Sequence, residues 1–361
     1  MNQANLNVAI NSLGYGVCGY NIWKELNKIA DVTLWPMQGQ VQPPLAITEM
    51  EAQQIQIDIS KQDDLHPKSS FLKVWHENQL AERVGLGFYS ALSFFEVNKF
   101  DTRRKTHLQS VDQILVPSQW AMDIVEEQLK ITLYVDHIIP MGVDREVFHE
   151  GLNNAPTYKC VFFNCGKWEV RKGHDILLTA FQDAFPNNSE VELLMMCDNP
   201  FLTDDERHHW EQPYRTDRRV KLIPRVNFQT ELAQIMGQVH CGVFPARAEG
   251  WNLELLEMMS MGKPVITTDY SAHTQFCTYD NSYLLDICEE EPMYDGKWFK
   301  KDCGTWASLD GAPYDQLVTH MRDVYADWST NPKRLVNEEG IETAKKFSWQ
   351  RTVERLHNVI F

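Results

Sequence analysis

Long apolar runs are missing from this sequence. No stretch of about 18 consecutive apolar residues occurs, so we expect no membrane-spanning helix. The first five residues have neither the basic nor the apolar region of a signal peptide, and we expect a cytoplasmic protein. The eight cysteines form no Cys-x2-Cys pair and lie mostly in apolar segments, which indicates buried free thiols rather than disulfides or a zinc site. No Asp-x-Asp triad of the metal-binding type is evident, so lysine and arginine side chains could take the place of a divalent metal.

Positive charge is also scarce. The formal net charge is −16. Binding to nucleic acid or to anionic membrane depends on clustered basic residues, so this balance disfavours a nucleic-acid substrate. The length of 361 residues predicts about two domains.

Short apolar strands and amphipathic helices alternate in both halves of the chain. We expect strands at 6–10, 32–35, 71–75, 113–116 and 137–139, and again at 161–165, 191–197, 220–223, 241–244 and 265–268. We expect helices at 20–29, 118–129, 175–185, 228–237, 252–259, 314–328, 334–346 and 349–360. A polar, turn-rich stretch at 150–156 suits a linker. The fold class predicted is α/β, with a doubly wound parallel sheet in residues 1–150 and a second in 151–346.

One stretch of the second half combines two acids with a helix start. Glu249 and Glu257 have seven residues between them, and Gly250 marks a tight turn after the strand at 241–244. The backbone N–H groups of Gly250, Trp251 and Asn252 would point out of the helix start, which is a typical phosphate site. An acid beside a phosphate is better placed to accept hydrogen bonds from sugar hydroxyls. Taken alone, both acids could equally be solvated helix residues.

Glycines with G-x-G-x-x-G spacing follow the first predicted strand. Gly14, Gly16 and Gly19 match the dinucleotide fingerprint, which also requires an acid after the next strand. The residues after 32–35 contain no acid, so a nicotinamide cofactor is disfavoured. A glycine loop that lets a ligand approach the backbone fits better.

A loop rich in cations follows the first strand of the second half. Between Gly166 and His174 it contains Lys167, Arg171 and Lys172. The succession of this loop and the Glu249 to Glu257 stretch resembles the nucleotide-binding half of the GT-B glycosyltransferases of family 4, which are retaining enzymes with a Glu-x7-Glu motif. Further stretches resemble that family at 116–120, 140–144, 262–267 and 347–349, whereas the N-terminal third resembles it only loosely.

The resemblance implies two Rossmann-like domains that face each other across a cleft. It also implies that the last helix, about 347–361, crosses back to the N-terminal domain. The implied reaction is retaining, metal-independent transfer of a sugar from a UDP-, GDP- or ADP-sugar to an acceptor hydroxyl. The acceptor would be a glycan, a lipid-linked molecule or another hydroxyl compound, and no cofactor is expected.

The resemblance also assigns roles to residues. Lys167 and Lys172 would neutralise the donor diphosphate, although the family often has arginine at the first position, and Glu249 would contact the transferred sugar. The other donor-binding positions implied are Gly14 and Gly16 over the diphosphate, Gly250, Trp251, Asn252 and Leu253 at the helix start, Glu257 on the ribose, and Arg225 and Val226 at the base. His76 and Glu96 are acceptor-side candidates, with structural roles open for both. A nucleotide-sugar epimerase and a noncatalytic nucleotide-sugar-binding protein remain as alternatives.

Overall fold

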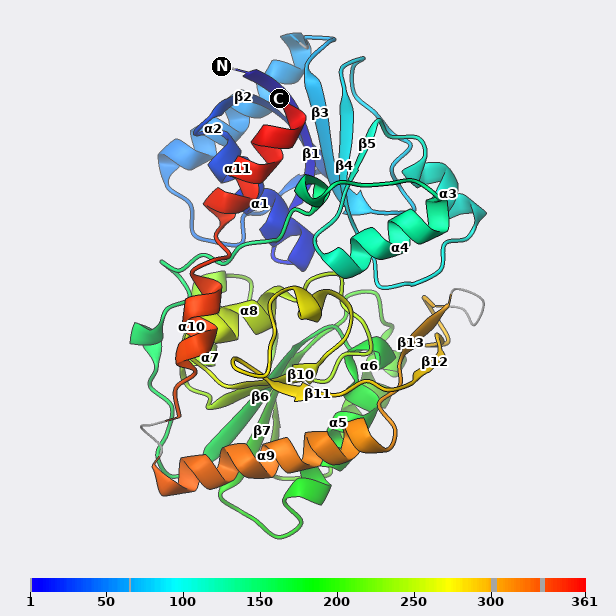
Figure 1. The fold of residues 1–361 in the computed structure, drawn as a ribbon. Coiled ribbons are helices and arrows are strands. Elements are labelled where there is room, and N and C mark those ends of the chain that lie inside the picture. The colour runs from blue at the N-terminus through cyan, green and yellow to red at the C-terminus, as the bar shows by residue number, and fades with distance from the viewer. Residues whose placement is uncertain (1, 65, 300–303, 332–334) are drawn as a thin grey trace. The chain divides into compact units, whose positions relative to one another are not determined.

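The chain folds into two compact units, each built on a parallel sheet. The computed structural model describes residues 2–64, 66–299, 304–331 and 335–361. The first unit comprises residues 1–142, 227–229 and 347–361, and the second comprises 143–226 and 230–346. Figure 1 shows helices packed on both faces of each sheet. This confirms the predicted α/β class with two Rossmann-like domains.

The first unit has a five-stranded sheet in the order β2-β1-β3-β4-β5, in which the neighbouring strands pair in parallel. The strands are β1 (Asn2–Ile10), β2 (Ala30–Val41), β3 (Ser70–His76), β4 (Tyr89–Phe94) and β5 (Gln113–Leu115). The helices are α1 (Gly14–Leu26), α2 (Glu49–Ser60), α3 (Thr102–Leu108), α4 (Gln119–Leu129) and α11 (Trp349–Ile360). Ser118 caps α4 by accepting a hydrogen bond from the Ala121 N–H at 3.3 Å, as the sequence predicts.

Two predicted elements of this unit differ from the structure. Helix α1 begins at Gly14, six residues before the predicted start at Tyr20. The glycines allow this early start, because a Cβ on Gly16 would lie 2.3 Å from the Asn11 backbone nitrogen. The predicted strand at 137–139 contributes only an isolated parallel bridge between Val116 and Ile138.

The second unit has a six-stranded parallel sheet in the order β11-β10-β9-β6-β7-β8. Its strands are β6 (Cys160–Gly166), β7 (Val191–Cys197), β8 (Val220–Leu222), β9 (Cys241–Phe244), β10 (Val265–Thr268) and β11 (Tyr283–Leu285). Its helices are α5 (His174–Ala184), α6 (Asp204–Tyr214), α7 (Gln229–Gly237), α8 (Leu253–Ser260), α9 (Ala312–Thr330) and α10 (Glu338–Ala344). A small antiparallel pair, β12 (Glu290–Pro292) and β13 (Thr305–Ala307), follows β11 and was not predicted.

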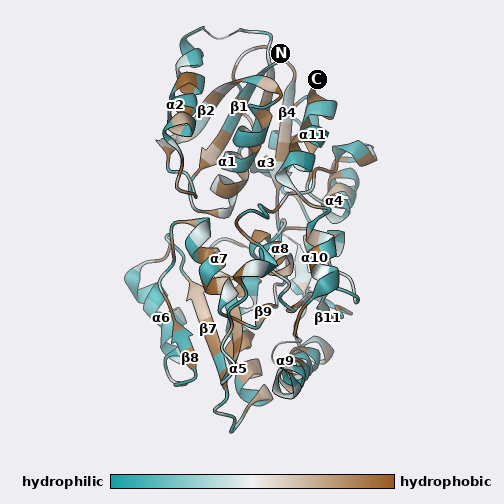
Figure 2. Cartoon of the chain, turned by 90° about the vertical axis from the view of Figure 1, so that its left-hand side faces the viewer, coloured by the Kyte–Doolittle hydropathy of each residue, from teal (hydrophilic) through white to brown (hydrophobic). Residues whose placement is uncertain are grey.

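Apolar strands form the core of the second unit. Phe162 on β6, Leu193 on β7 and Val243 on β9 are fully buried, and Phe181 on α5 and Met321 on α9 pack against them. Figure 2 shows the hydrophobic colour of β7 beside the largely hydrophilic helix α6. The alternation of apolar strands with half-polar helices explains why the sequence pattern predicts this sheet.

The last helix packs in the first unit. Ser348 caps α11 by accepting from the Arg351 N–H at 3.2 Å. The Thr352 hydroxyl donates to the Pro140 carbonyl at 2.7 Å, and α11 lies against α1. The return of the C-terminal helix to the N-terminal domain, implied by the resemblance, is therefore present.

The stretch 150–156, predicted as a linker, lies within the second unit. Asn153 accepts a hydrogen bond from the Lys263 ammonium at 2.7 Å, and the Asn154 N–H donates to the Gly237 carbonyl at 2.9 Å. These contacts tie polar, turn-forming residues to the body of the unit. The division between the units falls after Gly142.

No disulfide joins the described cysteines, and Cys288 is the exposed one among them. Cys303 lies outside the described residues. In the part of the chain that the structure describes, no helix is both long and apolar enough to span a bilayer.

Candidate functional site

Two loops meet at the carboxyl ends of neighbouring strands in the second unit. The cation loop follows β6, and the stretch that contains Glu249 follows β9, which is paired with β6. The Arg247 N–H donates to the Arg171 carbonyl at 2.6 Å. Gly173 has a φ of +74°, and a Cβ there would lie 2.1 Å from the Pro245 carbonyl, so only glycine fits this approach. Ligands of parallel sheets bind at this edge.

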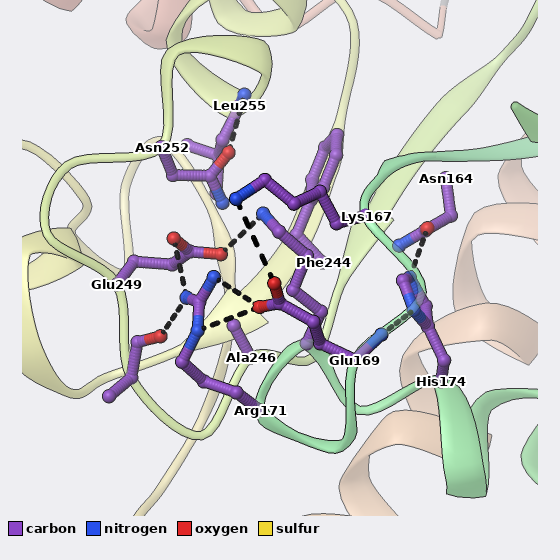
Figure 3. Close-up of polar contacts among 12 residues, drawn as sticks. Asn164, Lys167, Glu169, Arg171, His174, Phe244, Ala246, Glu249, Asn252 and Leu255 are labelled. Atoms are coloured by element: carbon purple, nitrogen blue, oxygen red, sulfur yellow. Dashed lines mark hydrogen bonds and ion pairs between the residues drawn. The ribbon is translucent and has the colours of Figure 1, made fainter. Parts of the chain in front are cut away.

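Glu249 lies between two cations in this loop pair. Its side chain is buried, and Figure 3 shows its two carboxylate oxygens turned to different partners. Oε1 lies 2.7 Å from the Lys172 ammonium, and Oε2 lies 2.8 Å from Arg171 Nη1. Burial alone would raise the pKa of Glu249, but the charges of Arg171 and Lys172 hold the pKa well below its ordinary value. The carboxylate is therefore ionised at neutral pH.

Arg171, to which the sequence assigned no role, is the most enclosed of the three loop cations. Its Nε and Nη2 donate to Glu169 Oε2 at 3.1 and 2.8 Å, and its Nη1 donates to the Ala248 carbonyl at 2.6 Å. Only 5% of Arg171 is exposed. The signal in the sequence is Glu169, an acid inside an otherwise cationic loop.

Lys167 lies at the edge of the same network. Its ammonium is 3.9 Å from Glu169 Oε1, and 38% of its side chain is exposed. The ammonium also lies 5.5 Å from the centre of the Phe201 ring. Lys167, Glu169, Arg171 and Glu249 thus form one chain of ion pairs (Figure 3). Lys172 joins it through Glu249. Such a set can hold an anion next to a hydroxyl-bearing ligand.

A second set of contacts fixes the backbone at the start of α8. The Glu249 N–H donates to Ser271 Oγ at 2.8 Å. Asn252, with φ +82°, caps the helix by accepting from the Leu255 N–H at 3.2 Å, and its amide group contacts His273 Nε2 at 3.0 Å. Burial lowers the pKa of His273 to about 4, so this imidazole is neutral and can accept the amide hydrogen. The contacts position the helix start predicted to receive phosphate.

His174 fixes the cation loop in the same way. Its Nδ1 accepts from the Glu169 N–H at 3.2 Å, and its Nε2 lies 2.9 Å from Asn164 Oδ1. Burial, assisted by the charges of Lys172 and Arg171, lowers the pKa of His174 to about 3. The ring is therefore neutral at neutral pH, and its two nitrogens hold the loop backbone against β6.

The remaining donor-side candidates take two kinds of position. Gly250, Trp251 and Leu253 are buried at the start of α8, and Glu257 is buried further along this helix. The Trp251 ring packs on Phe276 at 4.9 Å. Arg225 and Val226 follow β8 and are half-buried. The predicted contacts of these residues with ribose, base and phosphate stay predictions.

The first-unit candidates gather at the carboxyl edge of their own sheet. Gly14 and Gly16 form the first turn of α1, His76 ends β3, and Glu96 follows β4. His76 Nδ1 lies 2.9 Å from the Tyr15 hydroxyl. That these residues share one cleft with Glu249 stays a prediction.

Glu77, next to His76, was not predicted as a site residue. It is buried, and its Oε1 accepts from Arg104 Nε at 2.6 Å. Burial raises the pKa of Glu77 to about 7 against the opposing charge of Arg104, and the nearby Glu96 adds to the rise. The feature of the sequence that could have identified Glu77 is its position directly after the end of a predicted strand.

Within residues 2–64, 66–299, 304–331 and 335–361, no three His, Cys, Asp or Glu side chains are grouped as a metal site requires. Metal-independent chemistry stays a prediction.

The segment that contains this geometry is similar to segments of known glycosyltransferases. Residues 159–291, which include the loop cations and Glu249, match the family model described as glycosyl transferases group 1. An uncharacterised glycosyltransferase of Methanocaldococcus jannaschii is 24% identical over 253 residues, which are 69% of this chain and 59% of that protein. The match thus spans about three fifths of the relative.

Solved structures show the same fold at low sequence identity. Sucrose-phosphate synthase of Thermosynechococcus elongatus aligns with a TM-score of 0.69 and 14% identity, covering 99% of this chain and 98% of that one. HepE of Anabaena, in complex with UDP and glucose, aligns with a TM-score of 0.65 and 13% identity, covering 99% of both chains. These similarities show the GT-B fold.

Proposed function

We propose that the protein is a retaining glycosyltransferase that moves a sugar from a nucleotide-sugar to an acceptor hydroxyl without a metal ion. The observation that carries the proposal is the Glu249 carboxylate, ionised and held between Arg171 and Lys172 at the carboxyl ends of two paired strands. The segment that contains it matches glycosyl transferases group 1.

The chemistry of a sugar–diphosphate bond fits this arrangement. When the bond breaks, negative charge develops on the diphosphate and positive charge develops on the sugar. Lys172, Lys167 and the start of α8 would stabilise the diphosphate, because fixed cations and N–H dipoles at that point are most effective in the transition state. Glu249 would accept hydrogen bonds from sugar hydroxyls and lie near the positive sugar.

Retention follows in this proposal from attack on the same face that the diphosphate leaves. The leaving phosphate oxygen would take the proton of the acceptor hydroxyl, so no protein nucleophile is needed. His174 and His273 are poorly suited to this role, since burial disfavours the protonated form of both imidazoles and their nitrogens contact other protein groups.

UDP is the first nucleotide to test. The similar HepE protein has been solved in complex with UDP and glucose. For this chain the base, sugar and acceptor are to be found by thermal-shift measurements with UDP, GDP, ADP and CDP and with their sugars. Binding of a diphosphate and its sugar, but not of the free base, is the expected pattern.

The decisive experiment is a transfer assay on the donor so identified. Wild type should release nucleoside diphosphate in an acceptor-dependent manner, and NMR of the product should show the anomeric configuration of the donor. Activity should persist in EDTA; loss in EDTA with recovery in magnesium contradicts the metal-free proposal. Acceptor-independent release with inversion or epimerisation would favour the epimerase alternative, and tight binding without turnover would favour a noncatalytic protein.

A further inference from the structure

Each carboxylate oxygen of Glu249 has its own cation, and the two cations are held very differently. Arg171 contacts Oε2 and is also bound by the Glu169 carboxylate and the Ala248 carbonyl. Lys172 contacts Oε1 through a single flexible chain. Its stem passes Gly166, where a Cβ would lie 3.0 to 3.2 Å from the Lys172 side-chain atoms.

The two ion pairs therefore differ in which buried carboxylates would lose their charged partner if the pair separated. If Arg171 moved, both Glu169 and Glu249 would lose a buried partner, which is strongly unfavourable. If Lys172 moved, Glu249 would keep Arg171. The Lys172 side chain is also more exposed than that of Arg171, 14% against 6%. A lysine ammonium reorients easily, whereas the planar guanidinium of Arg171 is held in a fixed orientation by several acceptors.

We propose that Arg171 is a positioning residue that keeps Glu249 in place through Oε2. When the donor binds, the Lys172 ammonium moves from Oε1 of Glu249 to the diphosphate of the donor. This inference rests on the proposed function, because it assumes a diphosphate ligand at Lys172. Diphosphate binding then exposes Oε1 of Glu249 at the moment when a sugar hydroxyl needs an acceptor. Glu169 acts through Arg171 by fixing the guanidinium.

In this proposal the diphosphate and Glu249 compete for the Lys172 ammonium, and this competition can be measured. In the Glu249→Gln variant the competitor loses its charge but keeps an oxygen for Arg171. UDP should then bind about tenfold more tightly, the order expected when an ion pair no longer has to be broken, and uridine should bind as before. Isothermal titration calorimetry on the full chain measures both.

The role of Arg171 is tested by removing it together with its neutralising partner. The Arg171→Met/Glu169→Gln double variant keeps the net charge of the loop, so a simple electrostatic effect predicts unchanged UDP binding. In our proposal Lys172 becomes the sole partner of Glu249, and UDP binding weakens about tenfold while uridine binding stays constant. Adding Glu249→Gln should restore UDP binding to the level of the Glu249→Gln single variant.

Several outcomes overturn the inference. UDP binding equal to wild type in the double variant would show that Arg171 does not position Glu249 for the exchange. A parallel loss of uridine binding would show a merely structural role. Circular dichroism and thermal unfolding first establish that each variant folds. If the double variant does not fold, Arg171→Lys replaces it; a smaller UDP loss with unchanged uridine binding supports the proposal, and wild-type affinity contradicts it.

The controls separate this inference from the proposed function. If wild type binds none of UDP, GDP, ADP and CDP, the proposed function fails and the inference fails with it. If wild type prefers another of these diphosphates, that diphosphate and its nucleoside replace UDP and uridine. If wild type binds a diphosphate and the variants show no coupling, only the inference fails.

Discussion

Glu249 and Glu77 are two buried acids in corresponding places of the two units. Each follows a parallel strand at the carboxyl edge of its sheet, and each contacts an arginine, at 2.8 Å for Glu249 and 2.6 Å for Glu77. Yet the pKa of Glu249 is held well below its ordinary value, whereas burial raises the pKa of Glu77 to about 7. Glu249 has a second cation, Lys172, while Glu77 has a neighbouring acid, Glu96. The surrounding charges, and not burial alone, therefore decide the protonation state.

The same substitution in both acids gives the strongest test of this contrast. Glu249→Gln should lower the rate of sugar transfer at least about a hundredfold, because it removes charge beside the reacting sugar in a water-poor site. Glu77→Gln should lower it much less, since the acid is already about half protonated near pH 7. Steady-state transfer assays measure both, with Glu339→Gln on the exposed face of α10 as the control. Equal losses for the two acids would contradict the comparison.

Removing one cation beside each acid, Lys172 for Glu249 and Arg104 for Glu77, extends the comparison to UDP binding. Lys172→Met should weaken UDP binding about thirtyfold and uridine binding little, because a phosphate-directed cation is lost. Arg104→Met removes the cation of Glu77 and should leave UDP affinity unchanged. Calorimetry with UDP and uridine on both variants decides; similar losses for UDP and uridine in Lys172→Met would argue against a phosphate contact.

The pH dependence of stability should reveal Glu77. Its pKa is raised in the folded protein to about 7, so between the unfolded value near 4.5 and pH 7 the folded state holds a proton that the unfolded state has lost. Stability should therefore fall as pH rises through this window, by on the order of 2–3 kcal/mol from Glu77 alone. Glu249 acts in the opposite sense, since its lowered pKa contributes stability that is lost only as pH falls below about 4.5.

Glu77→Gln isolates this contribution. The variant should lose less stability than wild type between pH 5 and pH 7.5, measured as the free energy of unfolding in urea. Glu339→Gln should follow wild type across the same range. A variant whose stability changes with pH as steeply as that of wild type would show that Glu77 titrates normally.

The sequence pattern was enough to predict the α/β class, most strands of both parallel sheets and most helices, because buried strands and amphipathic helices alternate clearly. It missed β4 and β11. It also predicted that the loops after β6 and β9 contain the candidate site, since the ends of paired parallel strands lie together. It did not show that Arg171, rather than Lys167 or Lys172, turns inward. Three cations in nine residues look alike until the positions of Glu169 and Ala248 are known.

The expectation of a linker at 150–156 illustrates a second limit. Polar, turn-forming residues are typical of linkers, but Asn153 and Asn154 here bind Lys263 and Gly237, more than eighty residues away. Such contacts depend on the tertiary structure. For the same reason the pKa of Glu77 could not be predicted, because it depends on burial in the folded unit and on the charges of Arg104 and Glu96 from other segments.

Lys167 should show the smallest effect and thereby mark the edge of the Glu249 network. More than a third of its side chain is exposed and its ammonium is 3.9 Å from Glu169, so solvent screens its charge. Lys167→Met should weaken UDP binding only about threefold, the range of exposed ion pairs. Lys167→Arg should bind UDP at least as tightly as wild type, because a guanidinium can pair with two phosphate oxygens. A loss from Lys167→Met as large as that from Lys172→Met would contradict this prediction. It would show that Lys167 and Lys172 contribute equally to diphosphate binding.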